Sequence, residues 1–221
     1  MPSPKGQTLF DLSGGHAALD LVNSLDNRFR ADGPNEMLAS YGDVLRFLAE
    51  SGLLSRQRAR LLSKVIAPDA AERALQSIRE LREATAVVFY GSLEGKPPAP
   101  QDVRVLERYF MNASQHRELR WATGPGDDPD TPDRPDRRPG LAWHWGRFET
   151  EPDLPLWILS EAVADVLLCD KMARVRTCDV HTCRWLFLDT SKNHTRRWCN
   201  MKVCGNRMKA RRFQQARRES P

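Results

Sequence analysis

Four of the five cysteines lie in one segment near the C-terminus, TCDVHTCRWLFLDTSKNHTRRWCNMKVCGNRMKARR, which covers residues 177–212. Cys178, Cys183, Cys199 and Cys204 follow the spacing C-x4-C-x15-C-x4-C. Two pairs of thiols, each close enough in sequence to be presented by one turn, are typical of a structural zinc site with four thiolate ligands. Because so short a segment buries little apolar surface, we expect metal binding to be coupled to its folding.

Other uses of these thiols stay open at this point. Two disulfides would suit an exported chain, but the first residues show no signal-peptide pattern and no segment is apolar enough to cross a bilayer. We therefore expect a cytoplasmic protein without a membrane partner. His181 or His194 could replace one cysteine as a ligand, and iron is the alternative metal. Four protein ligands would leave no open position on the metal, which predicts a structural site and no catalytic one.

The residues between the cysteine pairs predict a small hairpin. RWLFLDT (184–190) and HTRRW (194–198) have the pattern of two strands, with residues 191–193 at the turn. A helix rich in arginine is expected to begin after Gly205 and Asn206. Turn, hairpin, turn and helix is the order of a treble-clef-like finger, which we assign to residues 177–221. Trp185 and Trp198 are expected to form its small core, with base stacking as the alternative role.

Charge divides the chain sharply. Residues 171–221 hold 14 lysines and arginines against three acids, a net charge of +11, whereas residues 1–170 carry a net charge of −6. Such asymmetry indicates a polyanionic partner for the C-terminal part, because neutralised phosphates release condensed counterions. The candidate nucleic-acid-binding residues are Lys192, Arg196, Arg197, Arg207, Lys209, Arg211, Arg212 and Arg218.

The basic residues of the last predicted helix do not form a single stripe. Arg207, Arg211 and Arg218 fall within about 40° of one another at the helical period, whereas Lys209 and Arg212 lie on another side. This scatter favours contacts to a phosphate backbone, which position a protein without reading sequence.

Residues 1–176 predict a mainly helical domain with one β-hairpin, so that the whole chain is of the α+β class. Apolar periodicity predicts helices near residues 17–25, 41–50, 55–65, 69–93, 100–114 and 154–174. Alternating residues predict strands at 117–123 and 141–148, joined by a proline-rich mobile loop at 124–140. Cys169, in the last of these helices, is expected to be a core residue.

A polar row accompanies the first predicted helix. His16 with Asp20 and Asn23 with Asn27 each follow i, i+4 spacing beside an apolar row. Three readings stay open: a ligand pocket, a solvated helix face or a capping network. We find no phosphate loop, nucleophile elbow or metal-ligand cluster in residues 1–170, and we therefore do not expect an enzyme.

The tetrad Cys204-Gly205-Asn206-Arg207 and the segment before it resemble the CGNR zinc finger. GGHAALDLVNSLDNR (14–28) is similar to the start of the ABATE domain, which precedes this finger in a bacterial family described as stress-induced transcription regulators. The resemblance covers nearly the whole chain. It implies one structural zinc ion on the four cysteines and a DNA-binding role for the finger.

We therefore expect a DNA-binding transcription regulator with a sensory or dimerising N-terminal domain. DNA is the expected partner, with a small-molecule effector of the N-terminal domain and a homodimer as further expectations. Two alternatives remain: an RNA-binding protein, and a protein-interaction adaptor in which the zinc finger is only a scaffold.

Overall fold

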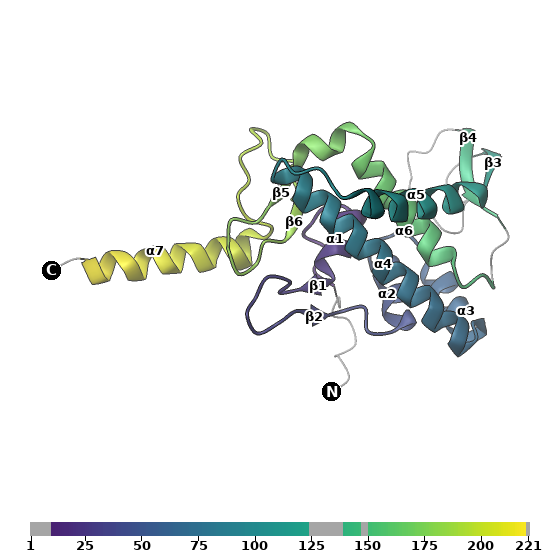
Figure 1. Ribbon diagram of the computed structural model, residues 1–221, viewed down its shortest axis with the longest axis horizontal. Helices are drawn as coiled ribbons and strands as arrows, with labels where there is room; N and C mark the ends of the chain where they lie inside the picture. The colour runs from purple at the N-terminus through teal and green to yellow at the C-terminus, as the bar shows by residue number, and fades with distance from the viewer. Residues whose placement is uncertain (1–9, 124–138, 147–149, 220–221) are drawn as a thin grey trace.

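One long helix organises the N-terminal part of the protein. The computed structural model describes residues 10–123, 139–146 and 150–219. Helix α4 (Pro68–Leu93) begins with proline, whose fixed φ and missing N–H suit a first helical turn. Helices α5 (Pro100–Gln115) and α6 (Leu154–Leu167) pack against it and against each other, and α1 (Ala17–Asn23) packs on α4 and α6 (Figure 1).

Two shorter helices close the other side of this bundle. In α2 (Tyr41–Glu50), Ser40 and Asp43 form a reciprocal capping box, which satisfies backbone N–H groups at the first turn and so fixes where the helix begins. In α3 (Arg56–Val65), the Ser55 side chain accepts a hydrogen bond from the backbone N–H of Arg58. Both helices turn their apolar stripes inward and share one core with α1, α4 and α6, whose fully buried members include Leu19, Leu21, Phe47, Leu62, Ile78, Leu81, Phe89, Leu159 and Val163.

The strands form three separate antiparallel pairs. They are β1 (Leu25–Asp26) with β2 (Asn35–Glu36), β3 (Arg117–Ala122) with β4 (Gly140–Trp145), and β5 (Val175–Thr177) with β6 (Leu186–Leu188). The combination of a helical bundle and antiparallel pairs confirms the α+β class. Among the described helices, none has both the length and the apolar character needed to cross a membrane.

A buried arginine fixes the β1–β2 pair to α4. The guanidinium of Arg82, 3% exposed, donates to both carboxylate oxygens of Glu36 at 2.6 Å and to Glu83 at 2.8 Å. Burial would raise the pKa of the Glu36 carboxyl, but the hydrogen bonds and charge of Arg82 outweigh it and lower that pKa. This pair therefore has a defined position, which matters because β1 carries Asp26.

The structure confirms the predicted helices to within a few residues at most ends. The last one stops earlier than predicted: α6 ends at Leu167, and a 3-10 turn, η1 (Asp170–Arg174), follows. Cys169 therefore lies outside the helix and is exposed, so its predicted place in the core is wrong. The hairpin formed by β3 and β4 is confirmed, whereas residues 124–138 of the predicted mobile loop lie outside the described residues.

Helix α7 (Asn206–Glu219) extends away from the rest of the protein. It contacts mainly the turn η2 (Met201–Gly205) that precedes it. Figure 1 shows it at one end of the molecule, with the β3–β4 hairpin at the other end. Most of the surface of α7 is therefore open to a partner.

Candidate metal centre and basic helix

The first cysteine pair lies on a turn that closes the β5–β6 hairpin. The backbone N–H of Cys178 donates to the carbonyl of Trp185 at 2.8 Å, and the N–H of Cys183 donates to the carbonyl of Val180 at 2.8 Å. Arg184, which follows the turn, has a positive φ of 52°. The four residues between Cys178 and Cys183 therefore form a wide loop that brings both thiols to the same side.

The second pair is presented by a single wide helical turn. The side chain of Asn200 accepts from the N–H of Lys202 at 2.9 Å and begins η2, while the N–H of Gly205 donates to the carbonyl of Asn200 at 3.1 Å. A Cβ on Gly205 would lie 2.4 Å from Sδ of Met201, so only glycine fits there without a shift. The amide of Asn206 then donates to the carbonyl of Lys202 at 3.0 Å.

The predicted second strand of the finger is wrong. Residues 194–198 do not pair with β6, because β6 bonds to β5 along one edge and Leu188 donates to Gly14 at 2.7 Å. The buried carboxylate of Asp189 instead accepts from the backbone N–H groups of Ser191 at 2.9 Å and Arg196 at 3.0 Å. These bonds hold residues 190–196 as a loop, and the strand partner lies before the first cysteine turn.

The four sulfur atoms lie close enough together to hold one metal ion. All lie within 4.8 Å of one another, with 3.7 Å between Cys183 and Cys199 and 3.8 Å between Cys199 and Cys204. A tetrahedron with Zn–S bonds of about 2.3 Å has S···S edges of about 3.8 Å, whereas a disulfide measures about 2.05 Å. These distances fit a tetrathiolate zinc site and exclude disulfides in this arrangement.

In the absence of a cation, crowding makes three of the four thiols poor acids, whereas hydrogen bonds from Cys183 and Cys199 lower the pKa of the fourth, Cys178. Hydrogen bonding to Cys178 raises the pKa of Cys183 and of Cys199, and burial raises the pKa of Cys204. A bound Zn²⁺ would offset the free energy needed to ionise these thiols, because it stabilises the thiolates directly. Nothing in the described residues adds a histidine to the ligand group, since His181 and His194 are both exposed.

Side-chain hydrogen bonds hold the finger against the N-terminal part of the protein. The buried amide of Asn23 donates to the carbonyl of Leu186 and accepts from its N–H, both at 2.9 Å. The indole of Trp185 donates to Asp26 at 2.8 Å, and the hydroxyl of Tyr90 donates to the carbonyl of Arg184 at 3.1 Å. Trp185 and Trp198 also pack, partly buried, on the cluster that contains the cysteines.

Arg196, a candidate nucleic-acid ligand, is committed to the fold. Its guanidinium donates to the carbonyls of Trp198 at 2.9 Å, Ser13 at 3.0 Å and Leu188 at 3.4 Å, and also to that of Cys199. It lies 4.5 Å from the centre of the Phe187 ring. It therefore ties the second cysteine turn to β6 and to the N-terminal segment.

The other basic candidates are more open. Arg197 is exposed and bonds to Asp179 at 2.6 Å. The remaining candidates whose side chains the structure describes are exposed, and none of them forms a salt bridge within the described residues: Lys192, Arg207, Lys209, Arg211 and Arg212. The side chain of Arg218 lies outside the described part of α7.

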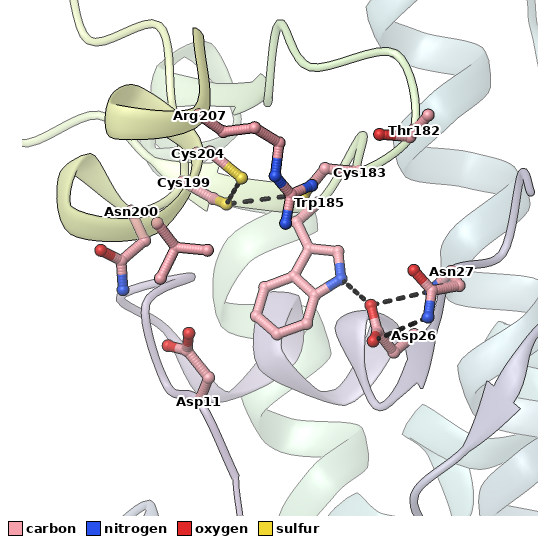
Figure 2. Close-up of a pocket in the computed structure, with 11 residues that line it drawn as sticks. Asp11, Asp26, Asn27, Thr182, Cys183, Trp185, Cys199, Asn200, Cys204 and Arg207 are labelled. Carbon is pink, nitrogen blue, oxygen red and sulfur yellow. Dashed lines mark hydrogen bonds between the residues drawn. The ribbon is translucent and has the colours of Figure 1, made fainter. Parts of the chain in front are cut away.

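A cavity of about 210 Å³ lies beside the sulfur cluster (Figure 2). Its lining combines three of the cysteines with Asp11, Asp26 and Arg207, and Arg207 reaches across it from the start of α7. Sequence reasoning missed the two acids here. The partner of Asp26 in the finger, Trp185, is 159 residues away in the chain, and Asp11 accepts a hydrogen bond from the nearby N–H of Ser13, so the sequence around neither acid indicates that it lines this cavity.

The polar row on the first helix is dispersed among different contacts. His16 caps α1 and bonds to Asp165 at 3.0 Å, and Asp20 is buried and accepts from the N–H of Gly14 at 2.8 Å. Asn23 holds the finger, and Asn27, with a positive φ of 56°, is the member of the row that lines the cavity. His16 therefore belongs to a capping network, and the four side chains do not surround one common ligand pocket.

Comparison with known families agrees with the two parts of the structure. The CGNR zinc finger model matches residues 174–218, and the ABATE model, described as "Putative stress-induced transcription regulator", matches residues 15–170. Neither description is that of an enzyme. No curated protein matches the chain. Since the ABATE match covers well over half of the chain and the finger match adds the four cysteines that can hold one zinc ion, the protein belongs to the ABATE family and carries a C-terminal CGNR zinc finger.

Proposed function

We propose that the protein is a DNA-binding transcription regulator whose finger and helix α7 contact the phosphate backbone. The observation that carries this proposal is the projecting helix with Arg207, Lys209, Arg211 and Arg212 exposed and free of salt bridges in the described residues. Unpaired guanidinium and ammonium groups on an accessible helix neutralise phosphates without first breaking ion pairs.

The proposal divides the work between two regions. Residues 177–221 form the zinc finger that holds the basic helix, and residues 1–176 form an ABATE-like domain that regulates it, in the cytoplasm. Zinc acts structurally: held by four thiolates, it fixes the turn from which α7 starts. An effector of the N-terminal domain remains a prediction, because the polar residues first considered for it are used in capping and in holding the finger.

The test is the salt dependence of binding to short duplex DNA, measured by fluorescence anisotropy with the zinc-loaded full chain. Replacing Arg211 and Arg212 together with alanine should reduce the slope of log K against log salt by about 2. The matched control replaces Arg60 and Arg104, two exposed arginines on α3 and α5, and should leave the slope unchanged.

Two outcomes would overturn the proposal. If the zinc-loaded protein shows no salt-dependent binding to duplex DNA, the adaptor alternative is favoured. If structured RNA binds as tightly as duplex DNA, or more tightly, at the same salt, the protein is an RNA-binding protein.

A further inference from the structure

The β3–β4 hairpin carries an apolar surface that the proposed nucleic-acid binding does not use. Four large side chains there are more than half exposed: Leu119 at 53%, Trp121 at 65%, Leu141 at 67% and Trp143 at 53%. Single exposed apolar residues are ordinary on protein surfaces, whereas the largest contiguous apolar group on a protein is often functional.

The four residues lie on one face of the hairpin. Leu119 is directly opposite Trp143, and Trp121 is directly opposite Leu141. Residues two apart on a strand point to the same side, so the two cross-strand pairs form one block in which tryptophan and leucine alternate diagonally. The other face of the hairpin holds Ala122 and His144, which are buried, and the exposed Glu118 and Arg120, which form an ion pair.

The hairpin is held firmly at its base. The next pair on the same face is Arg117 with Trp145; Arg117 bonds to Glu161 of α6 at 2.7 Å, and the Trp145 ring stacks 6.4 Å from that of Trp157. The guanidinium of Arg117 also lies 4.9 Å from the centre of the Trp143 ring. The apolar block therefore has a fixed orientation relative to the helical core.

We propose that this block is a homodimer surface on which a second copy of the chain packs face to face. A two-fold axis running along the strands, between the two copies, brings β3 of one copy over β4 of the other. Leu119 then meets the position of Trp143, and Trp121 meets that of Leu141, in both directions. The diagonal pattern thus puts each large ring against a smaller side chain, as close packing requires.

The area agrees with a second copy as the occupant. Taking about 250 Å² for a fully exposed tryptophan, the two indoles leave about 300 Å² open, and the two leucines bring the total to about 500 Å² per copy. Two copies would bury about 1,000 Å² from the block alone, which is the lower limit for a specific interface. The neighbouring side chains would add to it.

Charge also favours self-association over a charged partner. Arg117 is the charged residue on this face, and Glu161 neutralises it, so two copies can approach without repulsion. The block offers no excess of either sign to an acidic or basic partner. The hairpin also lies at the opposite end of the molecule from α7, and a dimer through it leaves both basic helices accessible (Figure 1).

The first experiment is sedimentation velocity of the zinc-loaded full chain from about 1 to 100 µM, a range that spans weak and moderate dimers. The wild type should rise from the mass of one chain, 25.2 kDa, toward about twice that value. Trp121→Ser should remain monomeric over the whole range. The matched control Leu168→Ser, which changes a residue 75% exposed outside the hairpin, should dimerise as the wild type does. A monomeric wild type, or a Trp121→Ser variant that still dimerises, would overturn the proposal.

A second measurement tests the facing pairs and does not depend on one variant. A chain with Leu119→Lys and Trp143→Lys should be monomeric by repulsion, as should one with Leu119→Glu and Trp143→Glu. Mixed in equal amounts, the two should form a heterodimer, because position 119 of each copy faces position 143 of the other. Zinc content and the thermal melting curve establish that each variant is folded. Folded variants that fail to pair in the mixture would refute the face-to-face arrangement.

Discussion

Replacing Arg196 with alanine should damage the zinc site itself. The side chain was a candidate phosphate ligand on sequence grounds, yet its guanidinium serves four backbone carbonyls and one aromatic ring. Those carbonyls belong to the second cysteine turn, to β6 and to the N-terminal segment. The substitution therefore removes the group that joins three parts of the chain.

The size of the effect follows from these contacts. A hydrogen bond to a charged group contributes about 1.5 to 3 kcal/mol, and a cation–π contact about 0.5 to 2 kcal/mol. The side chain is only half-buried, so water can reach some of the released carbonyls, and we take about 3 kcal/mol for the total loss. Since metal binding is coupled to folding of the finger, this corresponds to about a 100-fold loss of zinc affinity.

The assay is competition for zinc with a coloured chelator, followed by thermal melting of the loaded protein. Arg197→Ala is the matched control: Arg197 is adjacent in sequence and exposed, and it forms one ion pair with Asp179 and a cation–π contact with Trp198 at 5.6 Å. An exposed ion pair contributes about 0 to 1 kcal/mol, so the control should hold zinc nearly as tightly as the wild type. Arg196→Lys should fall between the two, because a lysine cannot reach several carbonyls at once.

One pattern of results would refute this reasoning. If Arg196→Ala retained zinc and melted like Arg197→Ala, but lost binding to DNA, the arginine would act on the nucleic acid and the carbonyl contacts would be of little energetic weight.

Three further predictions concern the same region. Gly205→Ala should change zinc affinity by less than about threefold in the chelator assay, because the atom that its Cβ would meet at 2.4 Å, Sδ of Met201, belongs to a flexible side chain that is 48% exposed and can move away; a larger loss would show that Met201 is held in place. Burial raises the pKa of Asp20 to about 7, above its unfolded value of 3.8, so this group makes the protein more stable as pH falls from about 7 to 4. Asp20→Asn should therefore stabilise the protein by about 2 kcal/mol at pH 8 in urea unfolding, with the gain vanishing near pH 4; a gain independent of pH would contradict the assignment. Asn23→Ala should lower zinc affinity and, in the zinc-loaded protein, the melting temperature as well, because it cuts both bonds to Leu186; a normal melting curve would show that the finger is not held there.

Local signals were sufficient for much of this structure. The helices followed from apolar periodicity, and the β3–β4 pair followed from the alternation of apolar and polar residues. The spacing of the cysteines and the family resemblance together pointed to four thiol ligands, and the four sulfur atoms do lie within 4.8 Å of one another.

The errors arose where the partner of a residue is distant or is a backbone group. The second strand of the finger was sought after β6, but Val175 lies before the cysteines and is buried in the main core, so β6 pairs with β5 instead. Arg196 looked like a surface charge because its acceptors are backbone carbonyls, which every residue has and which no sequence pattern therefore indicates. Cys169 was read as a core residue because the apolar pattern gives no warning that α6 ends at Leu167.

The same contacts connect the N-terminal domain to the direction of the basic helix. Asn23 and Gly14 bond to β6. Arg196 in turn bonds to β6 and to the second cysteine turn. Helix α7 begins at Asn206, directly after that turn. No flexible linker separates these described elements. The orientation of α7 relative to the ABATE domain therefore depends on zinc and on the packing of α1, and a change in either would redirect the exposed arginines as one body.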